Sequence, residues 1–138
     1  MNGLLDVNEL QGTLHERLGE AVRVVERPDR ALMIRTPFTF PDGDSYPIHI
    51  SVASSGGLCL SDRGHMLMRM GFEHEVDSLL VGARGKLLER IMGESGLRWD
   101  GGALCLDTHV ELLPEAIFVF GQALTRVHDL TLHSTDST

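Results

Sequence analysis

Three aspartates and one histidine lie close together in the first half of the chain and could do chemistry. Asp42 and Asp44 flank a glycine in the stretch PDGD, and Asp62 precedes His65 in the stretch LSDRGH. Hard cations bind several carboxylate oxygens at once, and a histidine can act as a general base. If folding brings these four side chains together, they would form a metal-dependent hydrolase or nuclease site, which is the enzymatic alternative for this chain.

The same aspartates also have a structural explanation. Asp is favoured beside Gly in turns because its side chain bonds to nearby backbone, which accounts for Asp42 and Asp44. Ser61 can cap a helix that starts near Asp62, where a carboxylate meets the positive end of the helix. We therefore predict that the three aspartates mainly shape the chain. The protein is expected to have no catalytic residue, metal or cofactor.

Other motifs give an enzyme no further support. The stretch GARGK at 82–86 lacks the four-residue gap between glycines that defines a phosphate-binding loop, and it has Leu87 where that loop needs Ser or Thr. The seven histidines form no pair at the i, i+4 spacing of a helical metal site. Ser61 follows Leu60 directly and is not flanked by glycines as the nucleophile of a hydrolase elbow would be.

The charge balance favours a protein partner. Twenty Asp and Glu against twelve Lys and Arg give a net charge of −8. This total works against direct nucleic-acid binding, because such binding needs clustered cations to displace counterions from phosphates. Negative patches can steer a basic protein surface toward the molecule. The residues predicted to bind such a partner are the acidic ones at Asp42, Asp44, Asp62, Glu73, Glu75 and Asp77.

The periodicity of apolar residues predicts an α+β fold. Helical spacing is present at 4–20, 62–71, 87–92 and 111–130, and period-two alternation or a turn-bounded apolar run is present at 22–25, 31–40, 46–52, 58–60 and 97–106. This order predicts an antiparallel meander of three to four strands plus a short hairpin, packed against an N-terminal helix, one or two middle helices and a long C-terminal helix. We expect a single domain over 1–130 and a flexible tail over 131–138.

Location and assembly follow from the same patterns. No stretch approaches the roughly 20 apolar residues of a membrane span, and the N-terminus carries acids where a signal peptide carries basic residues. The two cysteines, Cys59 and Cys105, each stand between leucines as small half-buried side chains. We expect a cytoplasmic protein without membrane contact. The wide apolar stripe over 111–130 favours a homodimer through the C-terminal helix.

An ordered set of short motifs carries a family resemblance. Thr36, Pro37 and Phe38 are followed by a Gly-Asp turn, by the step Leu-Ser-Asp-any-Gly at 60–64 that opens a helix, and by a hairpin and a long apolar helix. This set resembles the bacterial domain-of-unknown-function family 1828. The resemblance implies a small soluble protein of bacterial or phage origin with no established activity. Arg63 and His65 stand where family members often carry a second acid and a small polar residue.

Three kinds of binding protein fit these observations. Small size, acidity and family context favour an inhibitor or regulator from a phage or mobile element, of anti-defence or anti-CRISPR type, that covers a basic surface. The order of elements also resembles class I type III secretion chaperones, which form dimers; this is an analogy of fold alone. A third alternative is a structural or immunity-type subunit of a larger complex.

Overall fold

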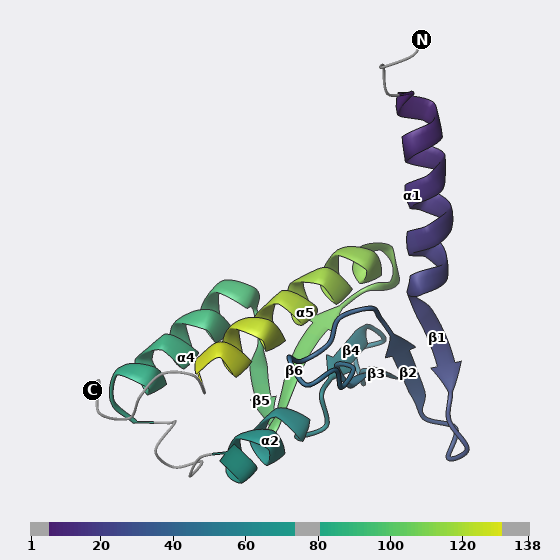
Figure 1. Ribbon diagram of the computed structural model, residues 1–138. Coiled ribbons are helices and arrows are strands. Elements are labelled where there is room, and N and C mark those ends of the chain that lie inside the picture. The colour runs from purple at the N-terminus through teal and green to yellow at the C-terminus, as the bar shows by residue number, and fades with distance from the viewer. Residues whose placement is uncertain (1–5, 74–80, 131–138) are drawn as a thin grey trace.

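The computed structural model describes residues 6–73 and 81–130 (Figure 1). Four α-helices are assigned in this part of the chain, namely α1 (Val7–Ala21), α2 (His65–Glu73), α4 (Gly82–Ser95) and α5 (Leu113–Asp129), the last preceded by the 3-10 turn η1 (Val110–Leu112). The strands are β1 (Arg23–Glu26), β2 (Leu32–Arg35), β3 (Ile48–Val52), β4 (Leu58–Ser61), β5 (Arg98–Asp100) and β6 (Ala103–Thr108). The predicted α+β fold with a long C-terminal helix is confirmed.

All six strands form one antiparallel sheet in the order β1-β2-β3-β4-β6-β5. The first four strands are the predicted meander. The β5–β6 hairpin does not stand apart from it, because β6 pairs with β4 and places Leu106 opposite Leu60. The sheet is therefore wider than the meander and separate hairpin that the sequence predicts.

One face of the sheet forms the hydrophobic core. Side chains alternate between the two faces of a strand, so Ile34, Ile48, Leu60 and Leu106 all point the same way and all belong to the core cluster. Helices α2 and α5 contact β6, and α4 packs on α5. These three helices lie together on one side of the sheet (Figure 1).

The C-terminal helix supplies a large share of this core. Pro114 stands in the first turn of α5, where its missing N–H costs no helical hydrogen bond. The predicted apolar stripe is buried at Ala116, Ile117, Phe120, Ala123, Leu124 and Val127. Within residues 6–73 and 81–130, α5 included, no helix has the length and apolar character needed to cross a membrane.

The predicted strand over 31–40 is too long. Strand β2 ends at Arg35, because Pro37 cannot donate to a ladder and the Thr36 hydroxyl accepts the N–H of Phe38 at 3.3 Å. The chain then turns inward, and Phe40 is buried with 1% exposure. Only an isolated bridge between Thr39 and Ser45 continues the pairing in this segment. The alternation at 38 and 40 reflects burial in a loop and not a strand.

The N-terminal helix differs from expectation in its packing. Its cap is Asp6, whose carboxylate accepts the N–H groups of Asn8 and Glu9 at 3.0 and 3.3 Å. None of the fifteen residues of α1 is buried. The helix runs outward from the start of β1 and away from the other helices (Figure 1). It is therefore an extension of the sheet's edge strand more than a layer of the core.

Candidate functional site: the arginine-bearing face of the sheet

Asp62 is an interior residue. It is 1% exposed, its Oδ1 accepts the N–H groups of Gly64 and Leu104 at 2.9 Å each, and its Oδ2 accepts that of Met66 at 3.0 Å. Asp62 thus accepts hydrogen bonds from the free backbone N–H groups at the start of α2. The Ser61 hydroxyl accepts only the N–H of Arg63. The prediction that Asp62 shapes the chain agrees with this geometry. Its proposed place on an exposed partner surface is wrong, because the carboxylate is enclosed by backbone donors.

Asp42 and Asp44 form an ion-paired turn. Asp42 accepts the N–H of Asp44 at 3.0 Å, and Arg69 of α2 reaches both carboxylates, at 3.0 Å from Asp42 and 3.4 Å from Asp44. The backbone hydrogen bond from Asp44, followed by the Arg69 guanidinium, holds the pKa of Asp42 below its ordinary value. The guanidinium also lies 4.0 Å above the ring of Phe40. Much of the negative charge of this turn is therefore matched within the molecule.

The remaining predicted residues do not join these aspartates in one metal site. His65 stacks on Phe40 with a centroid distance of 5.9 Å, and its Nε2 is buried without a hydrogen-bond partner. No three His, Cys, Asp or Glu residues in the described part of the chain are placed to hold a metal ion. Glu75, Asp77 and the side chain of Glu73 lie outside that part.

The second face of the sheet carries a different set of side chains. Register pairs Arg23 with Arg35, Met33 with His49, and His49 with Ser61, and alternation directs these residues away from the core. Helices α2, α4 and α5 lie on the opposite side of the sheet. We call this surface the open face.

Four arginines on or beside the open face have no carboxylate partner among the described residues. Arg23, Arg27, Arg35 and Arg63 are exposed, and none makes an ion pair within the described chain. Arg27 donates to the sulfur of Met33 at 3.3 Å, which places its guanidinium over this face. A fifth arginine, Arg98, is neutralised by Asp107, with hydrogen bonds of 2.8 and 3.1 Å. The part of the open face formed by β1 to β4 is therefore locally cationic.

His49 lies inside this cationic field. Burial lowers its pKa, and the nearby charges of Arg63 and Arg27 lower it further against the opposing effect of Asp29 and Asp62. Its Nδ1 is buried without a hydrogen-bond partner. Because both arginines act on the same imidazole, both positive charges lie near His49. A ring held neutral among cations can take up a proton when an anion arrives.

The two cysteines line the same face without forming a reactive pair. Both are free. Cys59 is partly buried, as the sequence predicts, whereas Cys105 is 1% exposed and therefore more deeply buried than predicted. Burial, with smaller contributions from Cys105 and Asp107, raises the pKa of Cys59 to about 11. Its thiol is thus protonated and unreactive near neutral pH.

Reasoning from the sequence missed the arginine cluster. Arg35 and His49 stand at the polar positions of alternating strands, and that is a readable signal for the face opposite the core. The net charge of the chain hid this cluster, because many of the acids lie on the helices: Glu9, Glu16 and Glu20 on α1, Glu89 and Glu94 on α4, Glu115 on α5.

The fold and this site define a small α+β domain in which no described helix covers the second face of the sheet. Comparison with known families gives a match over residues 36–127 to the family described as domain of unknown function DUF1828, and the chain belongs to that family. No curated protein and no solved structure matches the chain. The matched region contains His49, Asp62 and Arg63, whereas Arg23, Arg27 and Arg35 precede it.

Proposed function

We propose that the protein is a non-enzymatic binding module whose open face holds the phosphate backbone of a single-stranded nucleic acid. The observation that carries the proposal is the group of four exposed arginines on or beside the open face that lack a carboxylate partner among the described residues, two of which act on His49. A planar guanidinium can bind two phosphate oxygens in a fixed geometry, which makes arginine well suited to this ligand.

This proposal rests on where the charges lie on the molecule and not on the net charge of the chain. Binding energy from counterion release depends on the cations that touch phosphates, and four arginines supply such contacts even on a chain of net charge −8. The expectation that the chain does not bind nucleic acid directly followed from the net charge alone. That expectation stays a prediction, and the open face favours the reverse.

The shape of the open face favours a single strand over a duplex. Six strands spaced about 4.8 Å apart give a sheet roughly 24 Å across, which is about twice the ~12 Å width of a major groove. The described strands present no Phe, Tyr or Trp side chain on this face, so bases have no large stacking platform there. Binding should therefore depend on the backbone and show little sequence preference.

The test is the salt dependence of binding to a labelled oligothymidylate, measured by fluorescence anisotropy. Four phosphate contacts predict a slope of log affinity against log salt of about −2.8, since single strands give roughly 0.7 per contact. Arg63→Gln should reduce this slope by about 0.7 and weaken binding. Arg126→Gln is the matched control, because Arg126 on α5 pairs with Glu94 away from the open face. Absence of binding at low salt, or equal effects of the two variants, would refute the proposal.

A second candidate is the acidic inhibitor that the composition suggests. The observation in its favour is that α1 leaves the body of the molecule and carries Glu9, Glu16 and Glu20 on one side, all exposed. Such a ridge could cover a basic protein surface, as an anti-defence or anti-CRISPR inhibitor from a phage would. A salt-titrated pull-down from a bacterial host that carries CRISPR effectors tests it. The Glu16→Gln, Glu20→Gln double variant should lose the captured basic complex if this candidate holds.

A further inference from the structure

Helix α1 displays an apolar stripe that nothing in the described chain covers. Val7, Leu10, Leu14 and Leu18 are between 45% and 64% exposed. At 100° per residue these four side chains fall within about 80° of one another, so they form a single narrow stripe along the helix. The three glutamates of the acidic ridge lie on the opposite side. The stripe can therefore be buried without enclosing a carboxylate.

A helix of this kind needs packing to persist. An isolated helix of about 15 residues is marginal in water even with a favourable sequence. Gly12 and Gly19 weaken α1 further, since each costs about 1 kcal/mol relative to Ala, and a Cβ at either position would meet nothing within 4 Å. The cap at Asp6 offsets about one of these losses. Burial of the apolar stripe would supply the stability that the local sequence of α1 does not provide.

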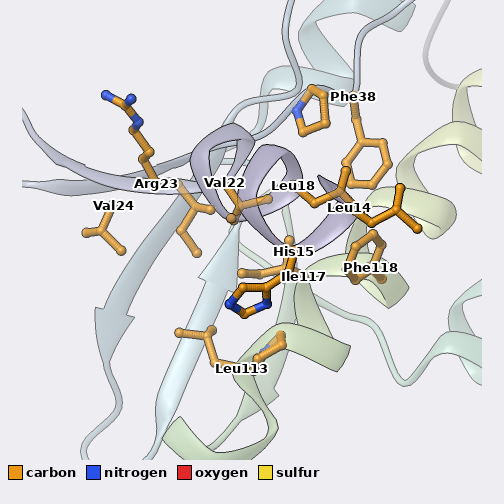
Figure 2. Close-up of a pocket in the computed structure, with 14 residues that line it drawn as sticks. Leu14, His15, Leu18, Val22, Arg23, Val24, Phe38, Leu113, Ile117 and Phe118 are labelled. Atoms are coloured by element: carbon orange, nitrogen blue, oxygen red, sulfur yellow. The ribbon is translucent and has the colours of Figure 1, made fainter. Parts of the chain in front are cut away.

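An apolar groove of about 610 Å³ lies beside the C-terminal half of the stripe. Leu14 and Leu18 of α1 form one wall, and Phe38, Leu113 and Phe118 form the other (Figure 2). Phe118 is 50% exposed although it borders this groove. Val7 and Leu10 do not line the groove and continue the stripe beyond it. Each molecule thus presents both an apolar groove and, at Val7 and Leu10, a part of the stripe that has no groove beside it.

We infer that the occupant of the groove is α1 of a second copy of this chain. The two helices pair antiparallel about a two-fold axis near Leu14, so that Leu10 of one copy meets Leu18 of the other. Val7 and Leu10 of each copy then enter the partner's groove and pack against its Phe118. Such an isologous interface uses the same surface twice, as two-fold dimers do.

The area available is sufficient for a specific dimer. Fifteen residues give a helix about 22 Å long, and half the side surface of a cylinder about 10 Å wide is roughly 350 Å². Two such half-surfaces give about 700 Å², and the groove walls that cover the partner's helix add to this area. The sum comes close to the roughly 1,000 Å² expected of a biological interface. This interface centres on α1, unlike the dimer through the C-terminal helix that the sequence suggests.

The first test is the mass of the full chain in solution by light scattering and sedimentation equilibrium. The wild-type protein should be a dimer, and Leu10→Glu should make it a monomer with unchanged sheet content by circular dichroism, since Leu10 belongs to no core. Val52→Glu on β3 is the control: Val52 is 74% exposed and lies outside the groove, so its variant should stay dimeric.

The second test fixes the geometry. Leu14→Cys should form an intermolecular disulfide under mild oxidation because two copies of this position meet near the axis, whereas Glu16→Cys, on the far side of α1, should not. A monomeric wild-type protein overturns the inference. So does a dimer that survives Leu10→Glu but is lost in Val119→Glu, because Val119 is an exposed residue of α5 outside the groove.

Discussion

The backbone N–H of Leu104 donates a hydrogen bond of 2.9 Å to the carboxylate of Asp62, which is 42 residues earlier in the chain. The same carboxylate accepts the N–H groups of Gly64 and Met66. One buried side chain thus joins the end of β4, the start of α2 and strand β6. The Leu-Ser-Asp-any-Gly step at 60–64 therefore has a structural role in this chain, because Asp62 holds these three segments together.

These three hydrogen bonds predict that Asp62→Asn destabilises the fold. An asparagine keeps one acceptor oxygen but places an amide donor where Met66 N–H needs an acceptor. Loss of a charge-assisted hydrogen bond with a buried donor left unpaired should lower the free energy of unfolding by about 2–4 kcal/mol. Chemical denaturation measures this change.

Asp44→Asn is the matched control for that measurement. The Asp44 side chain is 67% exposed and makes one ion pair of 3.4 Å with Arg69, so its loss should cost less than about 1 kcal/mol. Equal stability of the two variants would contradict the structural role of Asp62.

Local sequence was sufficient to predict most of the elements, although not the end of β2, and it did not predict their long-range pairing. Alternation at 48–52 and the apolar run at 58–60 predict β3 and β4, because each strand has one buried face. Nothing local shows that β6 pairs with β4 or that its Leu104 supplies a donor to Asp62. A cap at a helix start is ordinarily exposed, and burial of this one depends on a strand that comes much later in the chain.

The open face could be predicted in part. Arg35 and His49 occupy polar positions of alternating strands, so their direction away from the core follows from the sequence. Arg63 reaches the same field only because β4 lies beside β3 and pairs Ser61 with His49. The arginine cluster forms because of the order of the strands in the sheet, and the periodicity of apolar residues does not predict that order.

Two glycines in helices predict opposite effects of the same substitution. A Cβ on Gly93 of α4 would meet nothing within 4 Å, so Gly93→Ala should raise the free energy of unfolding by about 0.5–1 kcal/mol through helix propensity. A Cβ on Gly121 of α5 would lie 3.0 Å from the ring of Phe38. Gly121→Ala should therefore lower stability by about 1–2 kcal/mol, because displacement of the ring outweighs that gain.

Thermal and denaturant unfolding of both variants provide the check, with the Phe38→Leu background as a second measurement. A smaller side chain at 38 should relieve the clash and make Gly121→Ala close to neutral. Stabilisation by Gly121→Ala in the wild-type background would show that Phe38 moves freely and does not define the groove wall.

Binding of nucleic acid should tighten as pH falls if the proposed function holds. In the free protein, burial and the charges of Arg63 and Arg27 hold the pKa of His49 below its ordinary value, so the ring is neutral near pH 7. A phosphate bound nearby favours the protonated ring and raises that pKa. Complex formation then takes up a proton, and affinity rises as pH falls through the pKa of the bound state.

The expected increase is at least about twofold and at most about a hundredfold between roughly pH 7.5 and pH 5.5, because one proton changes affinity by at most tenfold per pH unit. Fluorescence anisotropy with oligothymidylate at constant ionic strength measures it. His49→Gln should remove most of the pH dependence, whereas His109→Gln should retain it, because His109 is an exposed residue beyond the end of β6. A pH dependence that is the same in both variants would place the titrating group elsewhere and contradict the assigned position of His49 beside the bound phosphate.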